Sequence, residues 1–476
     1  MKSKKIVLIA SPWIFKKTVE FVSQNLWAGY LASHIKKFSC HQIYFIDPLI
    51  EGFDQKKLLS TKYLDVYRFG LSDEEIVRRI PPDADIIGIN APFTDSRLVL
   101  FPLLKAIKEA FLEVPLVLGG IWPSTLPDEA ILSCADILVL GEGEKPFLEI
   151  ANGTPLKDIG GLVYKDGNRI IKTGKGKILT KEELDRPDYE IRPMKEYLKW
   201  SPRGEKELRT LSMITSRGCP NDCNFCSISV IYKKYLCRSA NNVLSEIKWA
   251  IKEYCIEHIE FEDDNLTSNR KRTIKIFKGL REIRKKHGIT WSAPNGIQIS
   301  TLNREAIKLI KESGCTLLYI AVESGDPEIL RLMNKPVWLE KAPPNRSSVL
   351  QVVRWCAEEK IPTSAFIMVA YPGEDKKSFK KTLQFCDKLI GLGINAITPL
   401  VATPYPGTKL YWLCEQNNWL VRPDSENTLV LAVYSDYSNE YVNIQTPKCS
   451  KEDAFERYEI MKERYPLKYN KNVNIN

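Results

Sequence analysis

The 476-residue sequence contains no apolar run that approaches the roughly 18 residues needed for a membrane-spanning helix. This absence argues against an integral membrane protein. The sequence also lacks low-complexity segments and short-period repeats, and its 44% hydrophobic and 27% charged residues are typical of an ordinary globular protein. Lys2, Lys4 and Lys5 precede an apolar run, as the basic residues of a signal peptide do. The run lacks a small-residue cleavage site, so we interpret it as a buried first strand.

Neither sign of charge dominates, because 69 Lys and Arg face 59 Asp and Glu, for a net charge of +10. This surplus could attract nucleic acid, an anionic membrane or an acidic protein, and it selects none of them. The twelve cysteines are scattered over a long chain, which argues against a disulfide framework and predicts a reduced, cytoplasmic protein. The local patterns predict a core position for six cysteines outside the triplet, Cys40, Cys134, Cys255, Cys315, Cys356 and Cys386. Three others could be exposed, Cys237, Cys414 and Cys449.

The first part of the chain alternates short apolar runs with helical patterns. The runs predict five strands, at residues 6–10, 42–46, 85–89, 115–118 and 137–140. Helices are expected at residues 19–36 and 97–112, and Ser72 with Glu75 indicates a capping box for another. Strands of this kind form a parallel sheet covered by helices on both faces, and such a sheet binds ligands at the carboxyl ends of its strands.

A hairpin and a linker interrupt the pattern, and a second series of units follows. Residues 161–164 and 169–173 flank a turn at Asp166 and Gly167, and residues 184–188 read as extended chain. Six more strands are expected, at residues 211–215, 258–261, 290–297, 317–322, 363–369 and 396–401. Six strand–helix units are fewer than the eight of a closed barrel, so we expect an open one.

These patterns together predict an α/β protein. A Rossmann-like doubly wound domain precedes a partial (β/α)6 barrel of the TIM type, and a small cap follows. The expected boundaries are residues 1–155 for the first domain, 156–205 for the hairpin and linker, 206–410 for the barrel and 411–476 for the cap.

Three cysteines carry the strongest chemical signal. Cys219, Cys223 and Cys226 have the spacing C-x3-C-x2-C directly after the first strand of the second series. Three thiolates on one tight loop can hold three irons of a four-iron cluster and leave the fourth iron open. The alternatives are a zinc site or three unconnected thiols. Zinc normally takes four protein ligands in a structural site, and neither His258 nor Cys237 has a regular ligand spacing to this loop.

This motif resembles that of the radical S-adenosylmethionine (SAM) superfamily, and Phe225 before the third cysteine matches the same family. The resemblance implies that the three cysteines bind a [4Fe-4S] cluster and act as its catalytic ligands. The open iron would chelate the amino and carboxylate groups of SAM. An electron from the cluster would then break a carbon–sulfur bond, which yields methionine and a 5′-deoxyadenosyl radical.

The resemblance extends to the later strand ends, where it implies SAM contacts. The usual Gly-Gly-Glu after the second strand is replaced here by Glu262, Asp263 and Asp264, so the carboxylate that binds the SAM amino group, Glu262 or Asp264, stays open. The other implied contacts are Glu323 and Ser324 after the fourth strand and Tyr405 after the sixth. Each segment alone could be structural: the aspartates could cap a helix, and Glu323 could be a solvated strand end.

The first domain resembles the cobalamin-binding domain of one subclass of this superfamily. The resemblance rests on residues 25–32, the glycines after the fourth strand, the segment 141–144 and the linker 184–189. Adjacent glycines let the backbone approach a bulky ligand, whereas the alternative is that they only turn the chain in a domain that binds nothing. The implied cobalamin contacts are Pro12, Trp13, Phe93, Thr94, Gly119, Gly120, Gly141 and Glu142.

The Asp-x-His-x-x-Gly motif that supplies a histidine to cobalt in other cobalamin proteins is absent, and His34 and His41 do not fit it. The resemblance therefore implies that water or the loop 90–94 meets the lower face of the cobalt, with Phe93 or Thr94 as the expected contact. The resemblance further implies that a cobalt without a histidine at its lower face favours methyl transfer.

The expected function is that of a cobalamin-dependent radical SAM methyltransferase. Cob(I)alamin would take a methyl group from one SAM, and a second SAM would supply the radical that removes hydrogen from an unactivated substrate carbon. The substrate radical would then take the methyl group. One alternative keeps both cofactors and leads to ring formation, cyclisation or carbon–carbon coupling. A more distant alternative is a metal-bearing nucleic-acid-binding protein.

The expected partners are a small-molecule or peptidyl substrate and a reducing electron donor such as flavodoxin or ferredoxin. Residues 269–288 contain nine Lys or Arg and one acid, Glu282. Such a helix is most often a solvated outer face, and a docking surface for an acidic electron donor is the alternative. We expect no nucleic acid, because the run has no interleaved aromatic residues for base stacking. No motif names the substrate.

Overall fold

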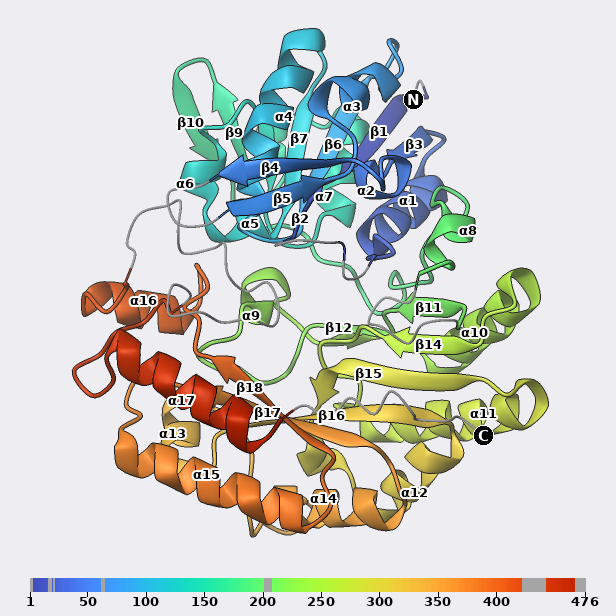
Figure 1. The fold of residues 1–476 in the computed structure, drawn as a ribbon. Coiled ribbons are helices and arrows are strands. Elements are labelled where there is room, and N and C mark those ends of the chain that lie inside the picture. Colours follow the sequence, from blue (N-terminus) through green and yellow to red (C-terminus); the bar gives the residue numbers. More distant parts are fainter. Residues whose placement is uncertain are drawn as a thin grey trace. The chain divides into compact units, whose positions relative to one another are not determined.

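The computed structural model describes residues 3–15, 19, 22–60, 65–200, 208–421 and 442–466. The chain forms two compact units (Figure 1). The first unit comprises residues 1–212 and 227–238, and the second comprises residues 213–226 and 239–476. Within the described ranges, no helix is both long and apolar enough to cross a membrane.

The first unit is built on a seven-stranded sheet of order β10-β9-β8-β7-β6-β1-β3. Five of the strands are parallel: β1 (Lys5–Ala10), β3 (Gln42–Ile46), β6 (Ile86–Ala91), β7 (Leu116–Gly120) and β8 (Ile137–Val139). The hairpin β9 (Leu162–Asp166) and β10 (Arg169–Lys172) extends this sheet, because β9 pairs antiparallel with β8. The predicted α/β architecture with a parallel sheet is confirmed.

Helices cover both faces of this sheet, as the alternation along β1 shows. Val7 and Ile9 belong to one buried cluster, which includes residues of α3 (Asp73–Arg79) and α4 (Arg97–Ala110). Ile6 and Leu8 belong to a second cluster on the opposite face, with residues of α1 (Leu26–Phe38) and α7 (Glu144–Ala151). Successive strand residues point to opposite faces, so two clusters are the expected outcome for a doubly covered sheet.

Two features of the first unit differ from expectation. The helix expected from residue 19 begins at Leu26, because its N-cap residue Asn25 has a left-handed φ of 41°, which a helix cannot contain. Residues 20 and 21 lie outside the described ranges. A small antiparallel sheet, unanticipated in the sequence, has the order β2-β5-β4. Its strands are β2 (Trp13–Phe15), β4 (Lys56–Ser60) and β5 (Asp65–Phe69). Trp13, one of the predicted cobalamin contacts, begins strand β2.

A six-stranded sheet of order β11-β14-β15-β16-β17-β18 forms the barrel portion. Because β11 and β18 are both edge strands, the barrel is open, as predicted. The strands are β11 (Thr210–Met213), β14 (His258–Phe261), β15 (Thr290–Ile297), β16 (Cys315–Glu323), β17 (Thr363–Val369) and β18 (Ala396–Val401). The strands from β14 to β18 are parallel to their neighbours, so their carboxyl ends share one edge.

Helices surround this second sheet. They include α10 (Ala240–Tyr254), α11 (Arg270–His287), α12 (Arg304–Glu312), α13 (Pro327–Leu332), α14 (Val349–Glu358) and α15 (Lys376–Gly391). In the region expected to be a cap, the structure describes α16 (Lys409–Gln416) and α17 (Lys451–Arg464), while residues 422–441 and 467–476 lie outside its description. Helix α17 packs against β17 and β18 (Figure 1).

The burial of the cysteines outside the triplet agrees with the prediction only in part. Three of the cysteines expected in the core are buried, Cys315, Cys356 and Cys386, and the other three are exposed, Cys40, Cys134 and Cys255. The three that could have been exposed are buried, Cys237, Cys414 and Cys449. Cys40 and Cys134 lie in the chain just before strands, and Cys255 is the C-cap of α10, so local apolar patterns overestimated their burial.

Candidate active site

The cysteine triplet lies on a loop that follows β12 (Ser216–Arg217). Gly218 turns the chain with a φ of 74°, a conformation that glycine adopts without steric cost, and its N–H donates to Asp264 Oδ2 at 2.8 Å. The N–H of Cys226 donates to the carbonyl of Cys223 at 3.1 Å. All three cysteines are outside any disulfide and of intermediate exposure. The loop therefore presents three thiols within eight consecutive residues, 219–226.

Asn224, inside the triplet, anchors the loop to two distant segments. Its N–H donates to the carbonyl of Met333 at 2.9 Å, and its side-chain amide donates to the carbonyl of Leu332 at 2.8 Å. Its own carbonyl accepts a hydrogen bond of 2.8 Å from the N–H of Leu410. The end of α13 and the start of α16 thus hold the loop between Cys223 and Cys226.

Asn265 is a site residue to which the sequence reasoning gave no role. Its side-chain amide donates to the sulfur of Cys219 at 3.3 Å and to Gln298 Oε1 at 3.1 Å. A hydrogen bond to a ligand sulfur stabilises negative charge there and tunes the reduction potential of a bound cluster. Its position directly after the Glu-Asp-Asp run was the only available signal.

The three carboxylates after β14 have different environments. Asp263 is buried and accepts hydrogen bonds from the N–H (3.0 Å) and hydroxyl (2.7 Å) of Thr215 and from the hydroxyl of Ser216. Asp264 holds the N–H of Gly218, and burial raises the pKa of its carboxyl to about 6. The partly exposed Glu262 accepts a bond of 3.2 Å from the side-chain amide of Asn295. Glu262 and Asp264 are thus both partly exposed, whereas Asp263 is buried.

The possibility that these aspartates cap a helix is wrong, because Asn269 caps α11 by accepting the N–H of Arg272 at 3.1 Å. His258 is also excluded as a zinc ligand candidate in this geometry. Its two ring nitrogens lie 2.8 Å from the hydroxyl of Thr290 and 3.0 Å from that of Ser292.

Glu323 forms a buried ion pair beside the cysteine loop. Its Oε1 lies 2.7 Å from Lys335 Nζ, and the two side chains are only 7% and 12% exposed, so Glu323 is not a solvated strand end. Glu323 has a φ of 70°, next to an irregular register between β16 and β17. Lys335 Nζ also lies 5.7 Å from the ring centroid of Phe225. Burial raises the pKa of the Cys223 thiol to about 12, and the positive charge of Lys335 opposes this rise.

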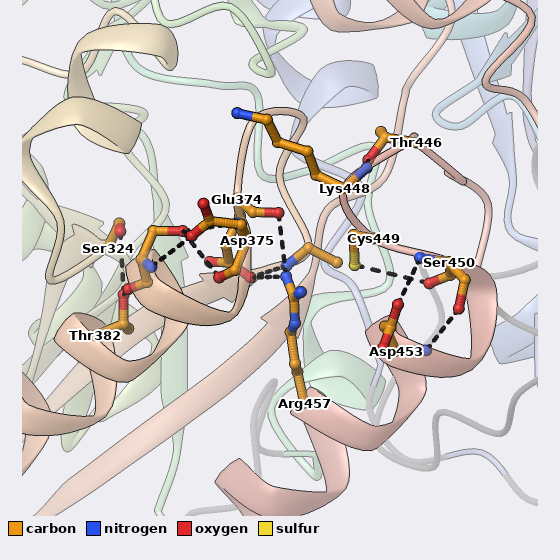
Figure 2. Close-up of polar contacts among 12 residues, drawn as sticks. Ser324, Glu374, Asp375, Thr382, Thr446, Lys448, Cys449, Ser450, Asp453 and Arg457 are labelled. Carbon is orange, nitrogen blue, oxygen red and sulfur yellow. Dashed lines mark hydrogen bonds and ion pairs between the residues drawn. The ribbon is translucent and has the colours of Figure 1, made fainter.

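The other two predicted SAM contacts lie at strand ends as expected. Ser324 is fully buried, and its hydroxyl lies 3.3 Å from that of Thr382 (Figure 2). The same hydroxyl accepts the N–H of Asp326 at 3.1 Å. Tyr405 is partly buried, and its carbonyl accepts hydrogen bonds from the N–H and hydroxyl of Thr408. Their roles toward SAM stay predictions.

In the first unit, the two glycines after β7 differ in their surroundings. Gly120 has a φ of 107°, and a Cβ there would lie 2.6 Å from Asn90 Oδ1 and would also clash with the Ala91 carbonyl. Only glycine fits this position. A Cβ on Gly119 would meet no atom closer than Val139 O at 3.9 Å. The backbone at Gly119 is thus accessible to a ligand.

Ser124 links the two glycine-containing loops. Its hydroxyl donates to the carbonyl of Gly120 at 2.6 Å and accepts the N–H of Gly141 at 2.9 Å. Gly141 itself has a φ of 77°, and Glu142 beside it is buried. The ends of β7 and β8 are therefore held together as one surface.

The ends of β1 and β6 bring two predicted cobalamin contacts together. The rings of Trp13 and Phe93 meet edge-to-face with centroids 6.1 Å apart, and Phe93 is 49% exposed. Pro12 and Thr94 beside them are buried. The arrangement leaves an aromatic surface at the ligand-binding edge of the sheet.

Neither of the two histidines considered in this unit lies at that edge. His34 is inside α1, with its ring 4.8 Å from that of Phe38. His41 precedes β3, and its Nε2 lies 3.1 Å from Asn152 Oδ1.

The open barrel and its cysteine loop define the class of protein. Residues 213–386 match the family model of the radical SAM superfamily. The chain is also 30% identical over 432 residues to an uncharacterised methyltransferase of Pyrococcus horikoshii, and the alignment covers 88% of this chain and 85% of that relative. The chain belongs to the radical SAM superfamily, and the resemblance inferred from its cysteine motif is confirmed.

Two solved structures share the fold over both units. The radical S-adenosylmethionine methyltransferase TsrM from Kitasatospora setae, with cobalamin and a [4Fe-4S] cluster bound, matches with a TM-score of 0.64 at 15% identity, covering 96% of this chain and 85% of that one. The cobalamin-dependent S-adenosylmethionine radical enzyme OxsB, with aqua-cobalamin and S-adenosylmethionine bound, matches with a TM-score of 0.69 at 17% identity. That match covers 90% of this chain and 64% of OxsB. At these identities the likeness establishes the fold.

Proposed function

We propose that this protein is a cobalamin-dependent radical SAM methyltransferase that methylates an unactivated carbon. The observation that carries the proposal is the loop of three cysteine thiols, with the side-chain amide of Asn265 hydrogen-bonded to the sulfur of Cys219, in a chain with the two-unit fold of cobalamin-dependent radical SAM enzymes. The methyltransferase name of the relative from Pyrococcus horikoshii supports the same outcome.

The donor set fits a cluster better than a single metal ion. Among the residues that the structure describes, no three His, Cys, Asp or Glu side chains converge as ligands of one ion. Cys219, Cys223 and Cys226 would each bind one iron of a [4Fe-4S] cluster. Together with SAM, the cluster supplies the 5′-deoxyadenosyl radical that abstracts hydrogen from carbon.

The residues around the loop fit the charges of SAM. Glu262 offers an accessible carboxylate for the amino group, and Lys335 places a positive charge beside the loop, where a carboxylate can bind. Glu323 holds Lys335 in place. Asp264 supports the backbone of the cysteine loop through Gly218. Ser324 and Tyr405 complete the proposed SAM site.

The first unit fits a large planar ligand at the carboxyl edge of its sheet. The open backbone at Gly119 and the loop at Gly141 and Glu142 would accept the nucleotide tail. Trp13 and Phe93, with the buried residues Pro12 and Thr94 next to them in the sequence, would face the corrin ring. Cobalamin supplies the methyl group that the substrate receives.

The finer proposals concern partners and location. A small-molecule or peptidyl substrate and an acidic one-electron donor of the flavodoxin or ferredoxin type fit the chemistry. Helix α11 is the proposed contact for the donor, because Lys271, Lys275 and Lys278 are exposed on it at helical spacing. We place the protein in the cytoplasm, where thiols stay reduced.

Anaerobic reconstitution with iron, sulfide, cobalamin, SAM and a strong reductant tests the proposal. The expected result is retained cobalamin absorption, a brown cluster and formation of 5′-deoxyadenosine. Loss of the cluster absorption is expected for Cys223→Ala and not for Cys356→Ala, whose thiol is buried in α14. A protein that retains no cobalamin and forms no 5′-deoxyadenosine would contradict the proposal.

A further inference from the structure

A fully buried ion pair joins the last described helix to the end of a barrel strand. Arg457 of α17 places Nη1 2.9 Å from Oε1 of Glu374, and the two side chains are 4% and 0% exposed (Figure 2). The guanidinium also lies 5.6 Å from the ring centroid of Phe379. Glu374 Oε2 and Arg457 Nη2 have no hydrogen-bond partner in the part of the chain that the structure describes.

A pair of this kind is weak evidence for stability, because desolvation of both charges offsets most of their attraction. The contacts of Glu374 point to a positional role instead. Its Oε1 accepts the N–H of Ala370 at 2.8 Å, and its own N–H donates to the carbonyl of Tyr371 at 2.9 Å. Ala370 has a φ of 60°, a strained conformation for a residue with a Cβ. The ion pair therefore holds a strained turn directly after β17.

This turn contacts the segment that anchors the cysteine loop. The hydroxyl of Tyr371, a buried residue, donates to the carbonyl of Leu332 at 3.3 Å. The same carbonyl accepts the side-chain amide of Asn224, which neighbours Cys223, at 2.8 Å. Gly373 packs so closely that a Cβ on it would lie 2.5 Å from Leu332 Cδ1. A continuous series of contacts thus runs from α17 to the cysteine loop.

We propose that Arg457 is a positioning residue for the cysteine loop, acting through Glu374 and Tyr371. Arg457 lies outside residues 213–386, which match the superfamily model, so the C-terminal helix of this chain contributes to the cluster environment. The expected effect on SAM binding rests on the proposed function. The effect on the loop itself requires only the contacts described above.

Two variants separate positioning from stability. The double variant Arg457→Leu/Glu374→Leu removes both charges, so no buried charge is left unpaired. Tyr371→Phe keeps the ion pair and removes only the hydroxyl that reaches Leu332. The matched control is Arg464→Leu/Asp387→Leu. It removes an exposed ion pair between α17 and α15, in which Arg464 Nη2 lies 2.6 Å from Asp387 Oδ2.

The first readout is hydrogen–deuterium exchange of residues 219–226 in the metal-free protein. The second is SAM affinity and the electron paramagnetic resonance spectrum of the reconstituted, reduced protein. For Tyr371→Phe we expect about fivefold faster loop exchange, corresponding to one lost hydrogen bond, and a similar loss of SAM affinity. The double variant should show larger changes of both kinds, and the control should show neither.

Wild-type loop exchange in Tyr371→Phe would overturn the inference, whatever the double variant does to stability. Equal effects of the control pair would overturn it as well. If the loop exchange changes as expected but neither the parent protein nor any variant binds SAM, the positioning role stands and the proposed function fails. The two failures are therefore distinguishable.

Discussion

The side-chain amide of Asn265 donates a hydrogen bond of 3.3 Å to the sulfur of Cys219. A donor to a ligand sulfur favours the reduced state of a cluster, because reduction places more negative charge on the sulfurs. Asn265→Ala should therefore lower the midpoint potential of the reconstituted cluster by about 40 mV, the equivalent of one hydrogen bond.

A redox titration followed by electron paramagnetic resonance measures this shift. Asn295→Ala is the matched control, because Asn295 donates to Glu262 and not to a sulfur in the described contacts. An unchanged potential in Asn265→Ala, or an equal shift in both variants, would show that the contact does not tune the cluster.

The adjacent glycines after β7 predict opposite outcomes for the same substitution. Gly120→Ala forces a Cβ into Asn90 and Ala91 at a φ of 107°, so it should destabilise the protein by about 1–3 kcal/mol. Gly119→Ala has free space around its Cβ and should leave stability within about 0.5 kcal/mol while reducing cobalamin retention. Urea unfolding and cobalamin absorption after desalting measure the two effects. Full cobalamin retention in Gly119→Ala would remove this residue from the proposed site.

The pair of Lys335 and Glu323 predicts a loss in both stability and SAM affinity. Lys335→Met leaves a buried carboxylate without its partner, which should cost about 3–5 kcal/mol of stability. SAM affinity should fall by about tenfold or more, because a positive charge beside the loop is lost. The control is Lys388→Met, whose exposed pair with Glu340 should contribute less than about 1 kcal/mol. Calorimetric SAM titration that gives the wild-type affinity for Lys335→Met would exclude the lysine from the site.

His258 predicts a pH dependence of stability. Burial lowers the pKa of its imidazole to about 4 from the ordinary value of 6.5. The neutral ring is favoured in the folded state, so its contribution is fully present above pH 6.5 and is lost as the pH falls toward 4. Between pH 7.5 and pH 5, the loss due to this group should be about 2 kcal/mol. His258→Gln should show a smaller loss over this interval in urea unfolding, whereas the exposed His287→Gln should behave as wild type.

The exposed lysines of α11 predict how electrons arrive. The triple variant Lys271→Glu/Lys275→Glu/Lys278→Glu should slow cluster reduction by an acidic flavodoxin about tenfold at low salt and much less at high salt. Reduction by dithionite should not change. A control triple variant, Lys57→Glu/Lys157→Glu/Lys195→Glu, alters the same charge at exposed positions of the first unit. Equal slowing in both variants would show a general charge effect and no docking surface on α11.

Much of the fold was predictable from the sequence, because buried parallel strands are short apolar runs between amphipathic helices. The strands at residues 258–261, 290–297, 363–369 and 396–401 have the expected bounds. The sheet of β2, β4 and β5 was not predictable, since its strands are short and β4 is mostly exposed, with no apolar alternation to mark it. The prediction of cysteine burial also failed for Cys40, Cys134 and Cys255, which lie just outside a helix or strand.

The candidate site was predictable only in part. The spacing of Cys219, Cys223 and Cys226 is a local pattern, so the sequence alone identifies it. The contact of Asn265 with a cysteine sulfur, the proximity of Lys335 to Phe225, and the link from Arg457 join residues far apart in the chain. No local pattern marks such residues, because their roles arise from the packing of separate strand ends.

The most direct test of the central claim is the product balance of the anaerobically reconstituted protein with methyl-labelled SAM. We expect both S-adenosylhomocysteine, from donation of the methyl group, and 5′-deoxyadenosine, from radical cleavage. In Cys223→Ala, 5′-deoxyadenosine should be lost and S-adenosylhomocysteine should stop at a single methylation of the bound cobalamin, because no substrate radical removes the methyl group. Formation of 5′-deoxyadenosine without S-adenosylhomocysteine would contradict methyl transfer, and 5′-deoxyadenosine in Cys223→Ala at the wild-type rate would contradict the radical SAM site itself.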